Sequence, residues 1–236
     1  MGNLTLAITT IGDLLLNNKI TRKMDGKPIE NIRLTIPEYQ RPYKWTARNA
    51  IQLLDDIIEA KNDNKEVYRV GTLILHKDKE KDGNYNIVDG QQRTITFALL
   101  LYSLYYPEDY KEYPIKAEDR ITFLNQVVFD NSHSRRNIAN NRQAFKRRIN
   151  KGGEDKENPV YAQEMLNLRN FIETRCELVV VVTEDISEAF QFFDSQNARG
   201  KALYPHDLLK AYHLREMTDI DETRTDCQGM GKDPTK

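Results

Sequence analysis

A run of β-branched residues at 176–182 constrains the fold more than any other stretch of this sequence. The run reads Cys-Glu-Leu-Val-Val-Val-Val. Valine favours strands because its branched side chain packs well on a pleated surface. A nearly continuous apolar strand is typical of the centre of a sheet, where both faces are covered. We therefore predict a central strand here, with its register fixed by the elements that cover it.

A strand, a tight turn and a helix are predicted at 85–102. Apolar residues lead into Asp89-Gly90-Gln91-Gln92-Arg93-Thr94, and the apolar segment 95–102 follows. The first turn of a helix carries unpaired N–H groups and the positive end of the macrodipole, so it suits anions. Gly90 permits an unusual φ or a close backbone approach, and Arg93 offers a forked, permanently charged donor. A nucleotide or phosphate site on this turn is our working hypothesis.

The same stretch also has a purely structural interpretation. Asp-Gly is a common turn, and Gln-Gln-Arg-Thr suits a solvated first helical turn. Short motifs match by chance often enough that the stretch alone leaves both interpretations open.

Length, charge and cysteine content set broad limits. The 236 residues suffice for one large domain or two small ones, and the net charge of −1 gives no global attraction to nucleic acid or membranes. The two cysteines, Cys176 and Cys227, provide neither a disulfide framework nor zinc-ligand spacing. The sequence shows no secretory signal and no apolar run of membrane-spanning length, so we expect a cytoplasmic protein without a membrane partner.

The segment 36–45 is rich in both aromatic residues and proline. Two prolines exclude a regular helix or a central strand. Tyr39, Tyr43, the single tryptophan Trp45 and the cation Arg41 lie on it. The segment either packs as a plug on the core or forms the wall of a ligand pocket.

Hydrophobic periodicity and turn signals place the other elements. Gly71, within one of the predicted strands, marks either a bulge or a close backbone contact. We predict helices at 5–18, 47–62, 118–129, 137–149, 160–173, from Ile186 to an end at 197–200, and at 205–217, strands at 31–36, 67–76 and 85–88, and a polar loop at 19–30.

The stretch 135–151 is the most basic part of the sequence. It is either a solvated helix face or a nucleic-acid patch. Phe145 is the single aromatic residue among these cations, so the aromatic interleaving typical of single-strand binding is poor.

Three stretches together resemble a known family. They are Ile-Pro-x-Tyr-Gln-Arg-x-Tyr-x-Trp at 36–45, Val-Asp-Gly-Gln-Gln-Arg at 88–93, and Phe-x-x-x-Asn-x-x-Gly-x-x-Leu at 193–203. In this order they are similar to the N-terminal domain of GmrSD-type modification-dependent restriction enzymes, whose relatives include phage-defence proteins. The resemblance implies an α+β fold like that of ParB and sulfiredoxin, with a small mixed sheet as core and a helical subdomain.

The resemblance also suggests domain boundaries. It covers roughly residues 5–217, and we predict one domain at 1–217. A mainly helical insertion would occupy 107–175. Residues 218–236 would be a polar tail or the start of a missing C-terminal domain.

Binding and hydrolysis of a nucleoside triphosphate is the function that the resemblance implies. Asp89 would hold Mg²⁺, Arg93 and the helix amides would stabilise phosphate charge, and Gln91 or Gln92 would orient the attacking water. The expected catalytic residues are Asp89, Gln91, Gln92 and Arg93. The expected nucleotide-binding residues are Gly90 and Thr94 at the turn, Arg41, Tyr43 and Trp45 on a second wall beside Tyr39, and Asn197, Arg199 and Lys210 from the late helices.

One departure from the family pattern concerns the nuclease. Many relatives carry a downstream His-Asn-His-type motif, and none of the four histidines here, His76, His133, His206 and His213, lies in such an arrangement. This chain is therefore expected not to cut DNA alone, and a nuclease domain or subunit outside it would be the partner. Two alternatives remain open: a nucleotide sensor without hydrolysis, and a DNA-interacting module that regulates a partner nuclease.

Overall fold

The computed structural model describes residues 4–22, 25–106, 121–126, 131–150 and 159–197. Within these residues, seven strands form one mixed sheet in the order β3-β2-β1-β7-β5-β6-β4. The strands are β1 Thr5–Thr10, β2 Ile20–Arg22, β3 Pro28–Ile29, β4 Arg33–Thr35, β5 Tyr68–Lys77, β6 Asn84–Asp89 and β7 Cys176–Thr183. The helices are α1 Ile11–Leu15, α2 Ala47–Asn62, α3 Gln91–Tyr105, α4 Thr122–Gln126, α5 Ser132–Asn150, α6 Pro159–Arg175 and α7 Ile186–Asn197. The arrangement confirms the predicted α+β class.

The valine-rich strand β7 lies at the centre of the sheet, as predicted. β1 runs antiparallel along one side of it and β5 runs parallel along the other. Leu178 and Val180 are buried in the main core, and Val181 is buried on the opposite side of the strand. Because β7 is paired along both edges, it anchors the strands that carry the candidate site.

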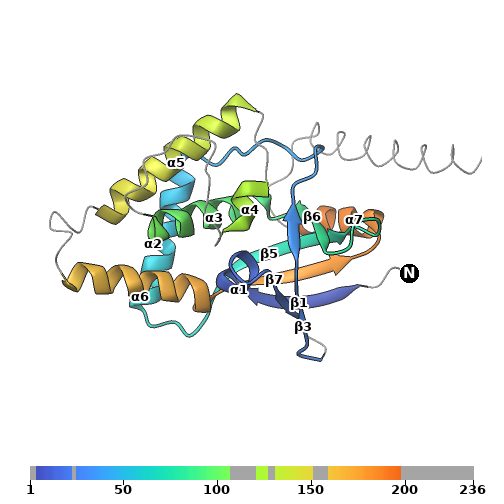
Figure 1. Ribbon diagram of the computed structural model, residues 1–236, viewed down its shortest axis with the longest axis horizontal. Helices are drawn as coiled ribbons and strands as arrows, with labels where there is room; N and C mark the ends of the chain where they lie inside the picture. The colour runs from blue at the N-terminus through green and yellow to red at the C-terminus, as the bar shows by residue number, and fades with distance from the viewer. Residues whose placement is uncertain (1–3, 23–24, 107–120, 127–130, 151–158, 198–236) are drawn as a thin grey trace, which may run out of the picture.

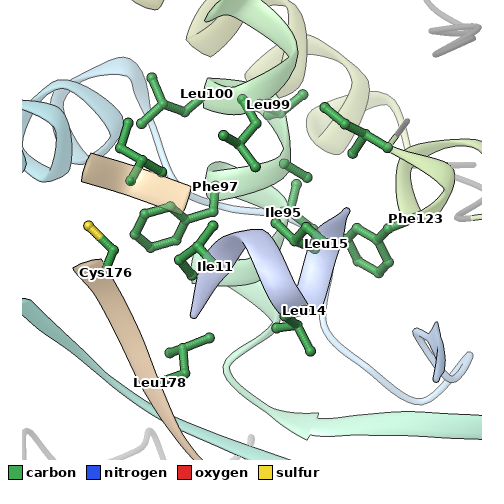
Figure 2. Close-up of a cluster of buried hydrophobic side chains, with 14 of the residues drawn as sticks. Ile11, Leu14, Leu15, Ile95, Phe97, Leu99, Leu100, Phe123, Cys176 and Leu178 are labelled. Carbon is green, nitrogen blue, oxygen red and sulfur yellow. The ribbon is translucent and has the colours of Figure 1, made fainter. Parts of the chain in front are cut away.

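Helices cover the two faces of the sheet unequally. In Figure 1, α2, α3, α5 and α6 gather on one side, and α7 lies beside β5 and β6. Figure 2 shows side chains of α1 and α3 facing Cys176 and Leu178 of β7. The smaller cluster beneath α7 consists of Ile74, Val88, Ala189 and Phe190. The main core therefore fixes α3, and α7 covers the other face beside the end of β6.

Helix α3 is the most buried of the described helices. Every side chain from Thr94 to Ser103 is buried. Such a helix cannot move relative to the sheet without opening the core. The turn that precedes it is therefore held in a fixed position.

The N-terminal region differs from the sequence-based prediction. The single helix predicted at 5–18 is wrong: Thr5–Thr10 form β1, and only Ile11–Leu15 are helical. β1 pairs with β7 over six residues, and these ladder hydrogen bonds outweigh the amphipathic spacing that suggested a helix. The loop predicted at 19–30 contains a short hairpin, β2 and β3.

Most of the remaining described elements follow the predictions, but α5 begins at Ser132, five residues before the helix predicted at 137–149. The strands at 31–36, 67–76 and 85–88 and the helix at 47–62 are present, and a register shift between Arg69 and Gly71 confirms the predicted bulge. Between Tyr105 and Cys176 the described elements are all helices. The domain boundaries and the likeness to ParB and sulfiredoxin remain predictions. No helix in the described ranges combines the length and hydrophobicity that crossing a bilayer requires.

Candidate functional site

The turn between β6 and α3 has the strand–turn–helix geometry predicted from the sequence. β6 ends at Asp89, Gly90 adopts a left-handed conformation with φ of 95°, and α3 begins at Gln91. A Cβ atom on Gly90 would lie 2.9 Å from Leu73 Cδ1 and 3.2 Å from the Thr72 carbonyl oxygen. Glycine is therefore required here for both its φ and its lack of a side chain.

The first turn of α3 presents three free backbone amides. Among the described residues, the backbone N–H groups of Gln91, Gln92 and Arg93 form no hydrogen bond. The first internal bond of the helix is from Thr94 N to Gly90 O, at 3.0 Å. Free amides together with the helix dipole give this end a partial positive charge.

Arg93 is held against the neighbouring strand β5. Its Nη2 donates to the Thr72 carbonyl oxygen at 2.7 Å and lies 3.9 Å from Asp89 Oδ2. The guanidinium covers Gly71, where a Cβ atom would lie only 2.2 Å from Nη1. Gly71 therefore makes room for the arginine. Arg93 retains donors beyond this one hydrogen bond.

Two of the predicted site residues at the turn have side chains that the protein itself uses. The Thr94 hydroxyl is buried and donates to Gly90 O at 3.0 Å. Gln92 Oε1 accepts from the backbone N–H groups of Lys44 and Trp45, and its Nε2 donates to Pro42 O. The Gln92 carboxamide thus connects the aromatic segment 36–45 to α3. Of the two glutamines predicted to orient a water, only Gln91 therefore remains a candidate.

Two buried polar atoms near the turn have no hydrogen-bond partner among the described residues. One is Oε1 of Gln91, whose residue is 6% exposed, and the other is the Tyr39 hydroxyl. Burial raises the pKa of Tyr39 to about 12, and its ring packs against Phe190 of α7. Tyr39 is placed beside β6 because the next residue, Gln40, donates its Nε2 to Val88 O at 2.9 Å. Unpaired buried polar groups in a native protein are rare and often mark a site for a ligand or a water.

The segment 36–45 is a packed loop whose residues play different parts. The Tyr43 side chain is fully buried, and its hydroxyl bonds Thr96 and Asn141. Burial raises the pKa of Tyr43, and its hydrogen bonds with Thr96 and Asn141 partly offset this. Tyr43 therefore offers no surface to a nucleotide in this structure. Arg41 is exposed and Trp45 is half-buried against the core, so these two remain candidates for the second wall.

Helix α5 supplies three polar residues that the sequence analysis did not identify. Ser134 Oγ accepts from Tyr43 N, Asn137 donates to Tyr43 O, and Asn141 donates to Tyr43 Oη and to Trp45 O. Positions 134, 137 and 141 lie on one face of the helix. In the sequence, the signal was this spacing of small and amide side chains, which the neighbouring arginines obscured.

The third group of predicted site residues comes from the end of the chain. Asn197 is the last residue of α7, which packs on β5 and β6, and its side chain is not among those described. Arg199, Lys210 and the helix predicted at 205–217 lie outside the described residues. Their roles remain predictions.

Metal ligands are sparse in the described ranges. No group of three or more His, Cys, Asp or Glu side chains that would suit a metal ion occurs there. Asp89, beside the free helix amides, therefore belongs to no such cluster among the described residues. Mg²⁺ is often held by one or two protein carboxylates together with substrate phosphates and waters, so this donor set fits Mg²⁺ only together with a phosphate ligand.

Comparison with known proteins places the chain in a family. Residues 13–214 match the family model described as GmrSD restriction endonuclease, N-terminal domain. A search of curated proteins found no match. The family match includes the turn at 89–94, the loop at 36–45 and the residues after α7 as far as 214. This chain belongs to the family of GmrSD restriction endonuclease N-terminal domains.

Proposed function

We propose that this domain binds and hydrolyses a nucleoside triphosphate as part of a restriction, or phage-defence, system. The observation that carries the proposal is the set of three free amides at 91–93 with Arg93 held beside them by β5. This set offers directed donors and a fixed cation to a polyphosphate.

Each residue of the turn has a distinct part in the proposed reaction. The free amides and the remaining donors of Arg93 bind phosphate oxygens and stabilise their charge as the terminal phosphate is transferred to water. Gln91, whose Oε1 is buried without a partner, orients that water. Asp89 would hold Mg²⁺, which when bound supplies charge neutralisation between phosphate oxygens.

Phosphate release tests the proposal directly. Each of the four ribonucleoside triphosphates is incubated with Mg²⁺ and the wild-type chain or the variant Arg93→Ala. We expect release from at least one nucleotide and a loss of about 100-fold or more in the variant, since one charge-stabilising donor is typically worth that much. Lys79→Ala is the matched control, because Lys79 is an exposed cation on the connection between β5 and β6.

The alternative outcomes separate the candidate functions. No release, combined with a nucleotide-dependent rise in melting temperature that Arg93→Ala removes, would support a sensor that binds without hydrolysing. Equal release by wild type and Arg93→Ala would refute an active site at this turn.

Mg²⁺ is expected to bind only together with nucleotide. Asp89 is a single carboxylate, and its Oδ2 lies 3.9 Å from the competing charge of Arg93 Nη2. Titration calorimetry should therefore show no Mg²⁺ binding in the millimolar range without nucleotide and measurable binding with it. Tight Mg²⁺ binding by the protein alone would contradict this assignment of ligands.

A second candidate function, DNA interaction, is favoured by the surface of α5. No acidic residue occurs from 131 to 153, and Arg136 and Arg147 are exposed on this helix. Arg148 is less available because it pairs with Asp55 at 2.9 Å. Exposed arginines on a helix that itself carries no acidic residue suit a phosphate backbone.

The double variant Arg136→Glu, Arg147→Glu is expected to weaken binding of a 20-bp duplex by roughly tenfold or more at moderate salt, because two phosphate contacts become repulsive. Fluorescence anisotropy at several salt concentrations measures this. Lys79→Glu, Lys81→Glu makes the same charge change at two exposed residues on another part of the surface. Equal weakening by both pairs would indicate a net-charge effect and exclude an α5 surface.

A further inference from the structure

A buried chain of hydrogen bonds connects α5 to the first turn of α3. Asn141 Nδ2 donates to Tyr43 Oη at 2.7 Å, Tyr43 Oη lies 2.7 Å from Thr96 Oγ1, and Thr96 Oγ1 donates to Gln92 O at 2.7 Å. Asn141, Tyr43 and Thr96 are all fully buried. Because the Thr96 hydrogen goes to Gln92 O, Tyr43 must be the donor to Thr96. All three bonds therefore point the same way, an arrangement in which each bond strengthens the next.

The same asparagine also holds the aromatic segment through its backbone. Asn141 Nδ2 donates to Trp45 O at 2.9 Å, and Asn137 and Ser134 bind the backbone of Tyr43 from the same face of α5. In Figure 1, the segment between β4 and α2 runs close to α5 on its way to α2. Two elements thus fix the segment: α5 through these polar residues and α3 through Gln92.

We propose that Asn141 is a positioning residue of the candidate site. It lies outside the three stretches that carry the family resemblance, and it acts through the segment that bears Arg41 and Trp45. The proposal rests on the proposed nucleotide function, because Arg41 and Trp45 form the second wall of that site. In this arrangement α5 positions the second wall, whereas β5 and β6 position the phosphate-binding residues at 89–93.

This division of roles predicts a split between binding and turnover. Loss of the Asn141 donors leaves Trp45 O and Tyr43 Oη without their donor, so the segment shifts and the wall loses its fit. Among the described residues, no hydrogen bond joins Asn141 to Arg93 or to the amides at 91–93. Arg93 is held by Thr72 O, and the amides are positioned by α3 itself. The KM for nucleotide should rise and kcat should change little.

The test compares Asn141→Asp with Asn140→Asp. The two substitutions add the same charge at neighbouring positions of α5, but Asn140 is exposed and Asn141 is fully buried. A carboxylate at 141 cannot donate to Tyr43 or Trp45. Tyr43→Phe is the second variant: it breaks the chain without a buried charge and retains the ring in the core.

Two readouts are measured on the full chain. The first is steady-state nucleotide hydrolysis, in which Asn141→Asp and Tyr43→Phe should raise KM by about tenfold, as expected for one lost buried hydrogen bond, with kcat within about twofold of wild type. The second is acrylamide quenching of Trp45, the only tryptophan in the chain. Quenching should increase in both variants and stay at the wild-type level in Asn140→Asp.

The outcomes distinguish this inference from the proposed function. A lower kcat with unchanged KM in a folded variant, or equal Trp45 quenching in all variants, would overturn the positioning role. If wild type neither binds nor hydrolyses any nucleotide, the proposed function fails. Increased Trp45 quenching in Asn141→Asp and Tyr43→Phe would in that case still show that Asn141 positions the segment 36–45, but not that the segment belongs to a nucleotide site.

Discussion

The variant Gly71→Ala is expected to reproduce the loss of nucleotide hydrolysis of Arg93→Ala, although Gly71 is not one of the residues proposed to bind nucleotide. A Cβ atom at this position would lie 2.2 Å from Arg93 Nη1. The guanidinium is the flexible end of a side chain, so it moves away and gives up its hydrogen bond to Thr72 O. That charge-assisted bond is worth about 1.5–3 kcal/mol, and the φ of 136° at Gly71 adds about 1–3 kcal/mol of strain for alanine.

A double-mutant cycle isolates the contact between Gly71 and Arg93. The free energy of unfolding is measured by urea denaturation for Gly71→Ala, Arg93→Ala and the double variant. The backbone strain is present in both backgrounds, whereas the displacement of the guanidinium occurs only when Arg93 is present. We therefore expect Gly71→Ala to cost about 1–2 kcal/mol less in the Arg93→Ala background. Additive costs would show that Gly71 does not position Arg93.

The fold could be predicted from the sequence for those elements whose local amino-acid pattern agrees with their place in the tertiary structure. The valine run of β7 and the apolar helix α3 are such elements, because their burial on the core is visible in their composition. β1 is the counterexample. Its residues Thr5–Thr10 have a helix-compatible spacing, and only the partner strand β7, far away in the sequence, makes them a strand.

The candidate site shows the same division. The turn conformation of Gly90 and the free amides follow from a strand, a glycine and a helix read in order. The sequence could not show that Gln92 binds the loop backbone, or that Tyr43 is buried instead of facing a ligand. These facts depend on how the segment 36–45 lies against α3 and α5, which is set by contacts between residues about 50 to 100 positions apart. Polar side chains do not reveal from sequence alone whether their partner is a ligand or the protein's own backbone.

Gly90→Ala is expected to be the most destabilising single substitution at the turn. Alanine at φ of 95° costs about 1–3 kcal/mol of strain. Its Cβ would also overlap Leu73 Cδ1 at 2.9 Å and approach the Thr72 carbonyl oxygen at 3.2 Å, and overpacking of this kind costs about 1–3 kcal/mol. Together we expect a loss of about 2–6 kcal/mol in the free energy of unfolding, measured by urea denaturation.

Gly26→Ala is the control for this variant because it separates strain from overlap. Gly26 also has a positive φ, of 66°, but beyond its chain neighbours no atom of the described residues lies within 4 Å of its added Cβ, so only the strain of about 1–2 kcal/mol should appear. The added Cβ at Gly90 overlaps residues of β5, the strand that also holds Arg93. We expect β5 and the start of α3 to move apart in order to remove this overlap. Nucleotide binding should therefore fall in Gly90→Ala and stay at the wild-type level in Gly26→Ala. Equal stability losses in the two variants would mean that Gly90 is not packed closely against β5. Our inference that this packing holds the free amides of α3 in a fixed position would then be wrong.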